Sequence, residues 1–218
     1  MKSKKMIGLV ALVAVAIMAS GAQAVTLFTL ADTNDDLFTH DSDGTNDPAP
    51  IPSAGSASVG NGTFAWGDLS TDTSPNTAEF LNGAFTSADW GGDGTFTSNA
   101  IDVSSYNAID INGQFDGLFN VSTEFSNFFY SLDGGTAVDF GVGLEDVTYT
   151  DEAVGVAGLD VSGASAMTVG FVYNHNGSSD YFNVDSLSVT GTQIPEPGSI
   201  ALLLAGVLGV IGLRRRNK

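Results

Sequence analysis

Residues 167–173 read Met-Thr-Val-Gly-Phe-Val-Tyr, with a large apolar side chain at every second position from Met167 to Tyr173. Successive side chains of a β-strand point to opposite faces of a sheet, so this period of two predicts a strand with one buried face. Similar short runs, separated by Gly, Asn and Asp, recur through the middle of the chain, and no long stretch has helical periodicity. Several short strands at this spacing predict an all-β fold with a single β-sandwich.

The expected strands are short alternating runs bounded by turn residues. They cover residues 95–103, 108–115, 119–132, 138–144, 167–173 and 181–189. Two segments have the composition of tight turns, Asp133-Gly134-Gly135 and Asn176-Gly177. Residues 39–58 hold three prolines and few apolar side chains, so we expect a long loop there.

Residues 1–24 have the features of a secretory signal peptide. Three lysines within the first five residues precede an apolar run, and Ala22 and Ala24 are the small residues that signal peptidase accepts. We therefore expect an N-terminal signal helix, export through the Sec translocon, and cleavage by signal peptidase after Ala24. The alternative is a permanent N-terminal anchor, but the apolar run is shorter than the ~20 residues that a spanning helix needs.

Residues 194–218 consist of three parts. Pro195-Glu196-Pro197 is followed by an apolar stretch over residues 200–213 and by a basic end over residues 214–218. As a helix the apolar stretch is about 21 Å long, whereas a hydrocarbon core is about 30 Å thick. We therefore expect a short transmembrane helix that serves as a transient anchor. The basic side chains, namely Arg214, Arg215 and Arg216, would remain in the cytoplasm, which places residues 25–193 outside.

These three parts, in this order, resemble the PEP-CTERM sorting domain. The resemblance implies recognition by an exosortase, a membrane-embedded cysteine protease-transpeptidase, with processing near residues 195–197. It also implies a Gram-negative host that makes exopolysaccharide, and a processed protein at the cell surface or in the extracellular matrix of a biofilm. The alternative is an ordinary tail anchor that happens to begin with Pro-Glu-Pro. In either case the tail does not define the activity of residues 25–193.

The central segment, residues 25–193, has the size of one domain and contains no Lys or Arg. It holds every acidic residue of the chain except Glu196, and its only potentially cationic side chains are His40 and His175. Nucleic-acid binding and adhesion to anionic lipids are therefore excluded as expected functions, and phosphoryl transfer is disfavoured. The expected partner is neutral, such as a glycan, or cationic, such as Ca²⁺ or a basic protein. The chain has no cysteine, so disulfides and thiolate chemistry are excluded as well.

Two segments of the central domain, residues 130–135 and 180–191, resemble late strands of jelly-roll domains. The relatives in question are lectin-like domains, MAM-like domains and carbohydrate-binding modules. Such domains often carry an Asp-Asn pair in the last strand, and here the pair is Asp185-Ser186. The resemblance implies a jelly-roll-like sandwich, and a fold alone does not imply a function.

Two groups of acidic residues are candidate Ca²⁺ ligands, because hard cations prefer oxygen ligands. In the first group, Asp41, Asp43 and Asp47 surround a Gly turn, although the closing Glu of an EF-hand is missing. In the second, Asp180 and Asp185 would contribute to a structural site of the jelly-roll kind. The alternatives are a polar loop for the first group, and a turn cap and an exposed strand residue for the second.

Trp66 and Trp90 are candidate platforms on which a sugar ring would stack, and the alternative is that both belong to the core. No nucleophile motif accompanies either histidine. The leading hypothesis is a non-catalytic surface or matrix protein that binds glycan with the help of calcium. A glycan-cleaving enzyme with an Asp/Glu pair and an inert matrix component are the alternatives.

Overall fold

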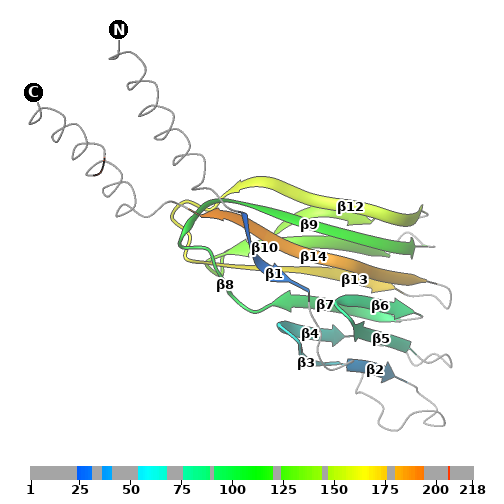
Figure 1. Ribbon diagram of the computed structural model, residues 1–218. Coiled ribbons are helices and arrows are strands. Elements are labelled where there is room, and N and C mark those ends of the chain that lie inside the picture. Colours follow the sequence, from blue (N-terminus) through cyan, green and yellow to red (C-terminus); the bar gives the residue numbers. More distant parts are fainter. Residues whose placement is uncertain are drawn as a thin grey trace, which may run out of the picture. The chain divides into compact units, whose positions relative to one another are not determined.

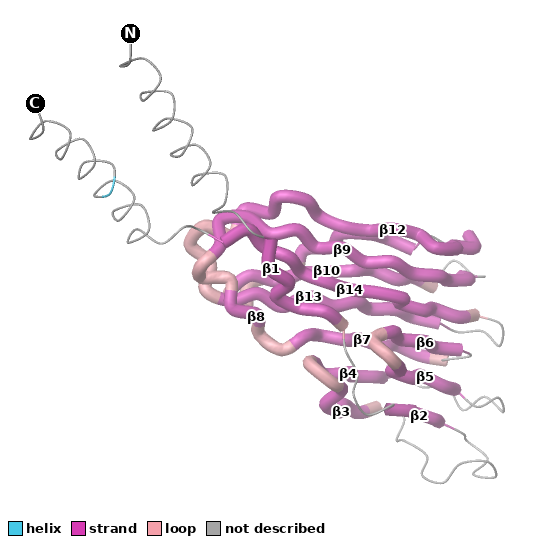
Figure 2. Tube along the Cα trace, viewed as in Figure 1, coloured by secondary structure: helices cyan, strands magenta, loops and turns pink. Residues whose placement is uncertain are grey.

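The computed structural model describes residues 24–30, 36–40, 54–67, 76–88, 91–119, 124–143, 147–175, 180–193 and Gly206. Figures 1 and 2 show that these residues form β-strands joined by turns, arranged in two sheets. Neighbouring strands pair in the antiparallel direction. The chain is therefore an all-β protein with two antiparallel sheets, as the alternating sequence predicts.

Sheet A has β14 near its centre. In spatial order it contains β12 (Val147–Asp160), β9 (Tyr106–Phe119), β14 (Tyr181–Gln193), β6 (Ala84–Ala88), β5 (Asn76–Leu81) and β2 (Asp36–His40), with β1 (Ala24–Thr29) also paired to β14. Sheet B has β13 near its centre. It contains β11 (Val138–Gly143), β10 (Phe125–Leu132), β13 (Ala166–His175), β7 (Gly92–Ser98), β4 (Gly62–Gly67) and β3 (Gly55–Val59), with β8 (Ile101–Asp102) also paired to β13.

Aromatic side chains from both sheets form the core. The rings of Phe85 on β6 and Phe171 on β13 have centroids 4.9 Å apart, and Phe171 stacks on Phe96 of β7 at 5.4 Å. Farther along the sheets, the Phe115 ring of β9 lies 5.6 Å from the Phe128 ring of β10. In the strands that carry these rings, alternate residues therefore face the other sheet, and the residues between them face outward.

Strand prediction succeeds where the alternation is clear, and the predicted turn over residues 133–135 is confirmed. Asp133 and Gly134 have φ of 50° and 70°, and the Gly135 N–H donates to the Leu132 carbonyl over 2.9 Å. The predicted loop over residues 39–58 is wrong at both ends, because β2 extends to His40 and β3 begins at Gly55. The predicted strand 119–132 is in fact the end of β9 and the whole of β10.

The features predicted for the two ends of the chain lie mainly outside the described residues. Residues 1–23, with the signal helix and Ala22, and residues 194–218 apart from Gly206, with the expected transmembrane helix, are among them. Among the residues that are described, no helix is long and apolar enough to cross a membrane. By internal contacts the chain divides into one compact unit, Thr26–Gly191, and a second unit made of Met1–Val25 and Thr192–Lys218. Cleavage after Ala24, the first residue of β1, stays a prediction.

Candidate functional site

Three aspartates on adjacent strands of sheet A bring their carboxylates together. They are Asp185 on β14, Asp116 on β9 and Asp151 on β12, and one oxygen of each lies within 4.8 Å of those of the other two. β9 lies between β12 and β14, and the buried side chain of Phe115 turns the next side chain, Asp116, to the outer face. We call these three residues the aspartate cluster.

The backbone of β12 positions Asp151 in this cluster. The pairing of β12 with β9 shifts register between Tyr149 and Glu152, and Asp151 lies in the shift with φ of 52°. Such a bulge re-aims a side chain within a strand. The Asp151 N–H donates to Asp116 Oδ1 over 2.6 Å, and Gln114 Nε2 donates to Asp151 Oδ1 over 3.2 Å. The bulge therefore holds two of the three carboxylates next to each other.

The cluster is electrostatically unfavourable in the absence of a cation. Burial raises the pKa of Asp185, and the neighbouring carboxylates of Asp116 and Asp151 raise it further. A pKa that is higher in the folded state means that ionisation of Asp185 costs stability at neutral pH, and that this cost disappears as the pH falls. A hard cation would offset the repulsion, and three carboxylates supply the oxygen ligands that Ca²⁺ takes, with water completing its coordination.

The predicted ligands have different fates. Asp185 belongs to the cluster, whereas Asp180 is buried at the residue before β14 begins, five positions earlier. Extended chain covers about 17 Å over that separation, so the structure does not bring Asp180 and Asp185 into one site. Asp41, Asp43 and Asp47 lie outside the described residues. Sequence reasoning missed Asp116 and Asp151, since only the order of strands in sheet A makes them neighbours of Asp185.

Trp66 is a core residue, and its prediction as a sugar-stacking platform is wrong. Only 8% of its surface is exposed, and its ring lies 5.4 Å from Phe38 and 5.8 Å from Phe64. The opposite residue on β3 is Gly55, where a Cβ atom would lie 2.8 Å from the indole ring. A sugar-stacking platform must face outward, whereas the aromatic side chains of β4 point toward sheet A. Trp90 lies outside the described residues.

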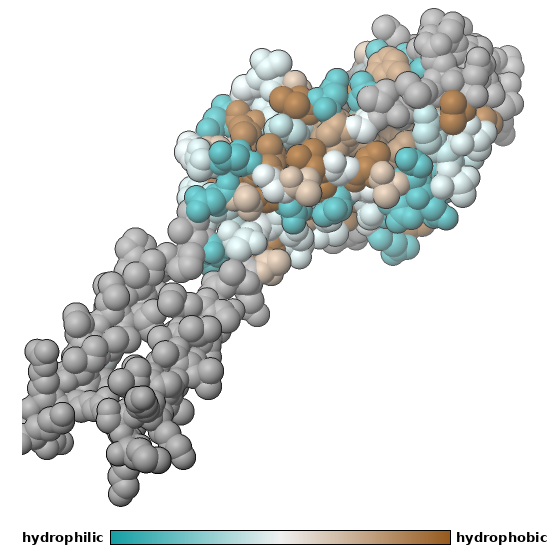
Figure 3. All heavy atoms as spheres, turned by 90° about the horizontal axis from the view of Figure 1, so that it is seen from above, coloured by the Kyte–Doolittle hydropathy of each residue, from teal (hydrophilic) through white to brown (hydrophobic). Residues whose placement is uncertain are grey.

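Few large apolar side chains of the described residues are exposed. Figure 3 shows hydrophobic residues between hydrophilic ones on the side that it presents. The exposed large apolar residues are Val25, Leu81, Phe125, Val138 and Val147. One of these, Phe125, is aromatic, and several other aromatic rings are half-buried, among them Tyr106, Tyr130 and Tyr149.

A second group of ionisable residues is buried in the interior. Glu124, His175 and Asp180 are each almost fully buried, next to the ends of β10, β13 and β14. The His175 ring packs against Phe119 and Tyr173, with centroids 5.6 Å and 5.1 Å away. Within the described part of the chain neither ring nitrogen has a hydrogen-bond partner. Burial lowers the pKa of His175 to about 4, although the nearby Glu124 opposes this shift.

The C-terminal segment matches a known family. Residues 193–216 match the PEP-CTERM protein-sorting motif, which includes Pro195-Glu196-Pro197 and the apolar stretch up to Arg216. The chain carries a PEP-CTERM motif. This confirms the resemblance drawn from the sequence and indicates an exported protein that is sorted through its C-terminal segment. The PEP-CTERM motif begins at Gln193, the last residue of β14.

No curated protein matches the chain as a whole. Among solved structures it is similar to a family 61 carbohydrate-binding module in complex with β-1,4-galactotriose, at 9% identity and a TM-score of 0.35, covering 78% of this chain and 88% of the other. A family 29 carbohydrate-binding module complexed with mannohexaose has 9% identity and a TM-score of 0.34, covering 78% and 92%. A xylanase from Cellvibrio japonicus in complex with xylopentaose has 16% identity and a TM-score of 0.38, covering 62% and 28%. These values describe a loose likeness in fold.

Proposed function

We propose that this protein is an exported, non-catalytic component of the cell surface or extracellular matrix whose sandwich domain binds a neutral glycan with the help of Ca²⁺. The observation that carries the proposal is the aspartate cluster on the outer face of sheet A. Uncharged polar side chains lie on the same outer face of these strands, namely Asn112 and Gln114 on β9 and Asn183 on β14. Carboxamides and carboxylates are the groups that donate to and accept from sugar hydroxyls.

The charge distribution supports a neutral ligand. Residues 25–193 contain no Lys or Arg, and His175, the one histidine whose side chain the structure describes, is buried. An acidic glycan would therefore meet carboxylates without a protein countercharge, which costs binding free energy. A bound Ca²⁺ would reduce the repulsion within the cluster and would offer open coordination positions to hydroxyl oxygens.

The proposed route to the surface follows from the two ends of the chain. The signal peptide directs the chain to the Sec translocon, and signal peptidase cuts after Ala24. The apolar stretch over residues 200–213 then holds the protein in the inner membrane until an exosortase processes the PEP-CTERM motif near residues 195–197. The domain is afterwards released to the cell surface or matrix.

Co-sedimentation with the host's exopolysaccharide tests the binding function. The full chain in a detergent without sugar head groups is mixed with the polymer in Ca²⁺ and in EDTA. We expect retention in Ca²⁺ that falls at least tenfold in EDTA. Equal retention in both buffers would remove calcium from the proposal, and no retention in either would leave an inert matrix component.

A matched pair of variants tests the cluster directly. Asp116 and Asp110 lie on the same face of β9, and each accepts a hydrogen bond from a backbone N–H of β12. Asp116 accepts from Asp151 over 2.6 Å, and Asp110 accepts from Gly158 over 2.7 Å. Only Asp116 belongs to the cluster. We expect Asp116→Asn to weaken Ca²⁺ binding at least tenfold by isothermal titration calorimetry, and Asp110→Asn to leave it unchanged. Equal affinities in the two variants would refute the site.

A second candidate function is supported by the raised pKa of Asp185. A carboxyl group with a raised pKa beside a second carboxyl group is the pairing that glycoside hydrolysis uses. On this view the chain would release reducing ends from exopolysaccharide, and Asp185→Asn would abolish the release while the binding measured by co-sedimentation remained. Absence of reducing ends after prolonged incubation with the unsubstituted protein would exclude this candidate.

A further inference from the structure

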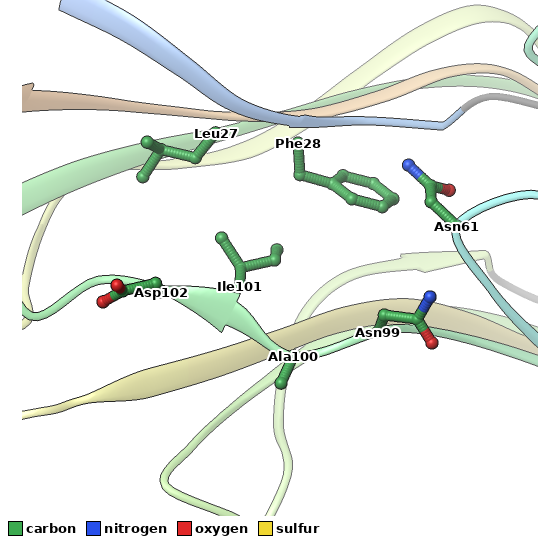
Figure 4. Close-up of a pocket in the computed structure, with 7 residues that line it drawn as sticks. All are labelled: Leu27, Phe28, Asn61, Asn99, Ala100, Ile101 and Asp102. Atoms are coloured by element: carbon green, nitrogen blue, oxygen red, sulfur yellow. The ribbon is translucent and has the colours of Figure 1, made fainter.

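A cavity of about 320 Å³ lies where β1 passes over the short strand β8. Figure 4 shows Leu27 and Phe28 of β1 above it and Ile101 of β8 pointing up toward them. Phe28 and Ile101 are buried, so their apolar atoms form fixed walls. This volume is at the lower end of the range for ligand pockets, which combine apolar walls with a few polar groups.

Three polar side chains line the same cavity. Asn61, in the turn between β3 and β4, and Asn99, after β7, lie together at one end, and Asp102 lies at the other (Figure 4). The turn segments that carry the two asparagines are joined by a hydrogen bond from the Asn99 N–H to the Asn61 carbonyl over 2.7 Å. These groups therefore have a defined spacing before any ligand arrives.

Oxygen acceptors predominate among these groups. Asn61 Nδ2 already donates to the Thr29 carbonyl over 2.6 Å, and Asn61 Oδ1 is enclosed by the protein, so the Asn61 side chain forms part of the wall and the acceptors for a ligand come from Asn99 and Asp102. Asp102 accepts from the N–H and the hydroxyl of Ser104 through Oδ1, over 2.9 Å and 2.7 Å. Its other oxygen, Oδ2, has no such bond and remains an acceptor. A ligand that donates several hydrogen bonds fits this arrangement.

We propose that this cavity binds one uncharged sugar unit of a glycan, with its hydroxyls donating to Asp102 and Asn99 and its apolar face against Leu27 and Phe28. The proposal rests on the glycan-binding function and adds a second contact point to it. No basic side chain lines the cavity, so a phosphate or carboxylate group has no countercharge there. The cavity is separate from the aspartate cluster, because none of its lining residues belongs to β9, β12 or β14.

Two aspartates of the same local geometry supply a matched control. Asp102 Oδ1 accepts from the N–H of Ser104 over 2.9 Å, and Asp160 Oδ1 accepts from the N–H of Ser162 over 2.9 Å. Both are exposed, and hydrogen bonds from the hydroxyl and the N–H of the serine two residues later lower the pKa of each. Only Asp102 lines the cavity. The variants Asp102→Asn and Asp160→Asn therefore change the same kind of turn, but only Asp102→Asn changes the wall of the cavity.

The experiment measures binding of the full-chain variants to the host exopolysaccharide in Ca²⁺, by co-sedimentation. We expect Asp102→Asn and the cavity-filling variant Asn99→Trp each to weaken binding at least tenfold, and Asp160→Asn to bind like the unsubstituted protein. Competition with a neutral monosaccharide should displace the polymer, whereas glucuronate should not. Urea midpoints of all variants identify any that fail to fold.

The outcomes separate this proposal from the function on which it rests. If the unsubstituted protein binds exopolysaccharide and both cavity variants, properly folded, bind equally well, the cavity proposal is overturned and the glycan-binding function stands. If the unsubstituted protein does not bind exopolysaccharide, the glycan-binding function and the cavity proposal are both wrong. Displacement by glucuronate alone would assign the cavity to an acidic sugar and would contradict the proposal as stated.

Discussion

His175 illustrates how a single residue makes the stability of this domain depend on pH. Its ring is fully buried between Phe119 and Tyr173, and its nitrogens find no hydrogen-bond partner in the part of the chain that the structure describes. The folded-state pKa of about 4 lies below the ordinary value of 6.5. Because the unfolded chain takes up the proton first, the stability that comes from neutral His175 is complete above pH 6.5 and is lost as the pH falls toward 4.

The variant His175→Phe tests this dependence. Phenylalanine keeps an aromatic ring in the apolar site and removes the two unpartnered nitrogens, so we expect equal or greater stability at pH 7. Between pH 6.5 and pH 4 the unsubstituted protein should lose roughly 3 kcal/mol that the variant retains. Urea unfolding at a series of pH values measures both curves. Parallel curves over this interval would show that another group titrates there.

Single residues also show why the candidate site was only partly predictable. Asp185 could be named from the sequence, because it lies in a clear strand pattern at the end of the domain. Its neighbours Asp116 and Asp151 lie 69 and 34 positions away in sequence, and no local pattern connects them. The prediction of Trp66 as a surface residue is wrong for a different reason. The period of two in a strand shows that it has two faces, but it does not show which face is buried.

At the scale of elements, prediction depended on how regularly each strand alternates. β13 and β14 bury alternate residues over most of their length, and both were predicted. β12 was missed, since nearly all of its residues are exposed or half-buried and two register shifts interrupt its pairing with β9. β3 lies in the segment predicted as a loop, because residues 39–58 hold three prolines and few apolar side chains. Its first residue, Gly55, lies against the Trp66 ring, where a Cβ atom would be 2.8 Å from the indole.

The turn after β10 fixes the register of β10 on β13. Asp133 Oδ1 accepts from the N–H groups of Ser165 and Ala166 over 2.9 Å each, and the Asp133 N–H donates to the Ala166 carbonyl over 2.9 Å. These bonds join the end of β10 to the beginning of β13, next to the pair Leu132 and Met167. β11 and β12 separate β10 from β13 in the sequence, and the Asp133 carboxylate joins these two strands. We call its hydrogen bonds to Ser165 and Ala166 the Asp133 clamp.

Substitutions at Asp133 separate the clamp from the backbone conformation. Asp133→Asn keeps an oxygen acceptor and tolerates a positive φ, whereas Asp133→Ala loses both advantages. We expect the alanine variant to lower the urea midpoint clearly and the asparagine variant to lower it only slightly. Hydrogen exchange should show the loss of protection at Ser165 and Ala166. Equal midpoints for the two variants would mean that the clamp contributes nothing.

At the scale of the whole molecule, electrostatic repulsion is the main unfavourable feature. The chain has a formal net charge of −18 at pH 7, and its basic residues all lie in the terminal segments. The folded domain therefore has carboxylates without Lys or Arg to pair with them, and self-repulsion opposes the compact state. Dissolved ions screen such repulsion over about 10 Å at 0.1 M salt.

Salt should therefore stabilise this protein. We expect the thermal midpoint to rise as NaCl increases from low to physiological ionic strength, and CaCl₂ at matched ionic strength to raise it further through the aspartate cluster. Asp116→Asn should keep the NaCl effect and lose the additional effect of calcium. Differential scanning calorimetry measures both contributions, and a midpoint that falls with NaCl would contradict this account of the charge.

The position of β14 has a consequence for the order of events during synthesis. This strand is the last one described in the chain, yet it lies between β9 and β6 in sheet A and buries Phe182, Val184 and Leu187 in the core. On the proposed export route, a chain that is still emerging from the translocon lacks the centre of one sheet, so the sandwich would not close until residues just before the PEP-CTERM motif had crossed. The fold would therefore be completed at about the moment when the sorting motif reaches the membrane. A chain truncated before β14 would lack both this strand and the sorting motif, and its incomplete sheet would be exposed to proteases outside the membrane.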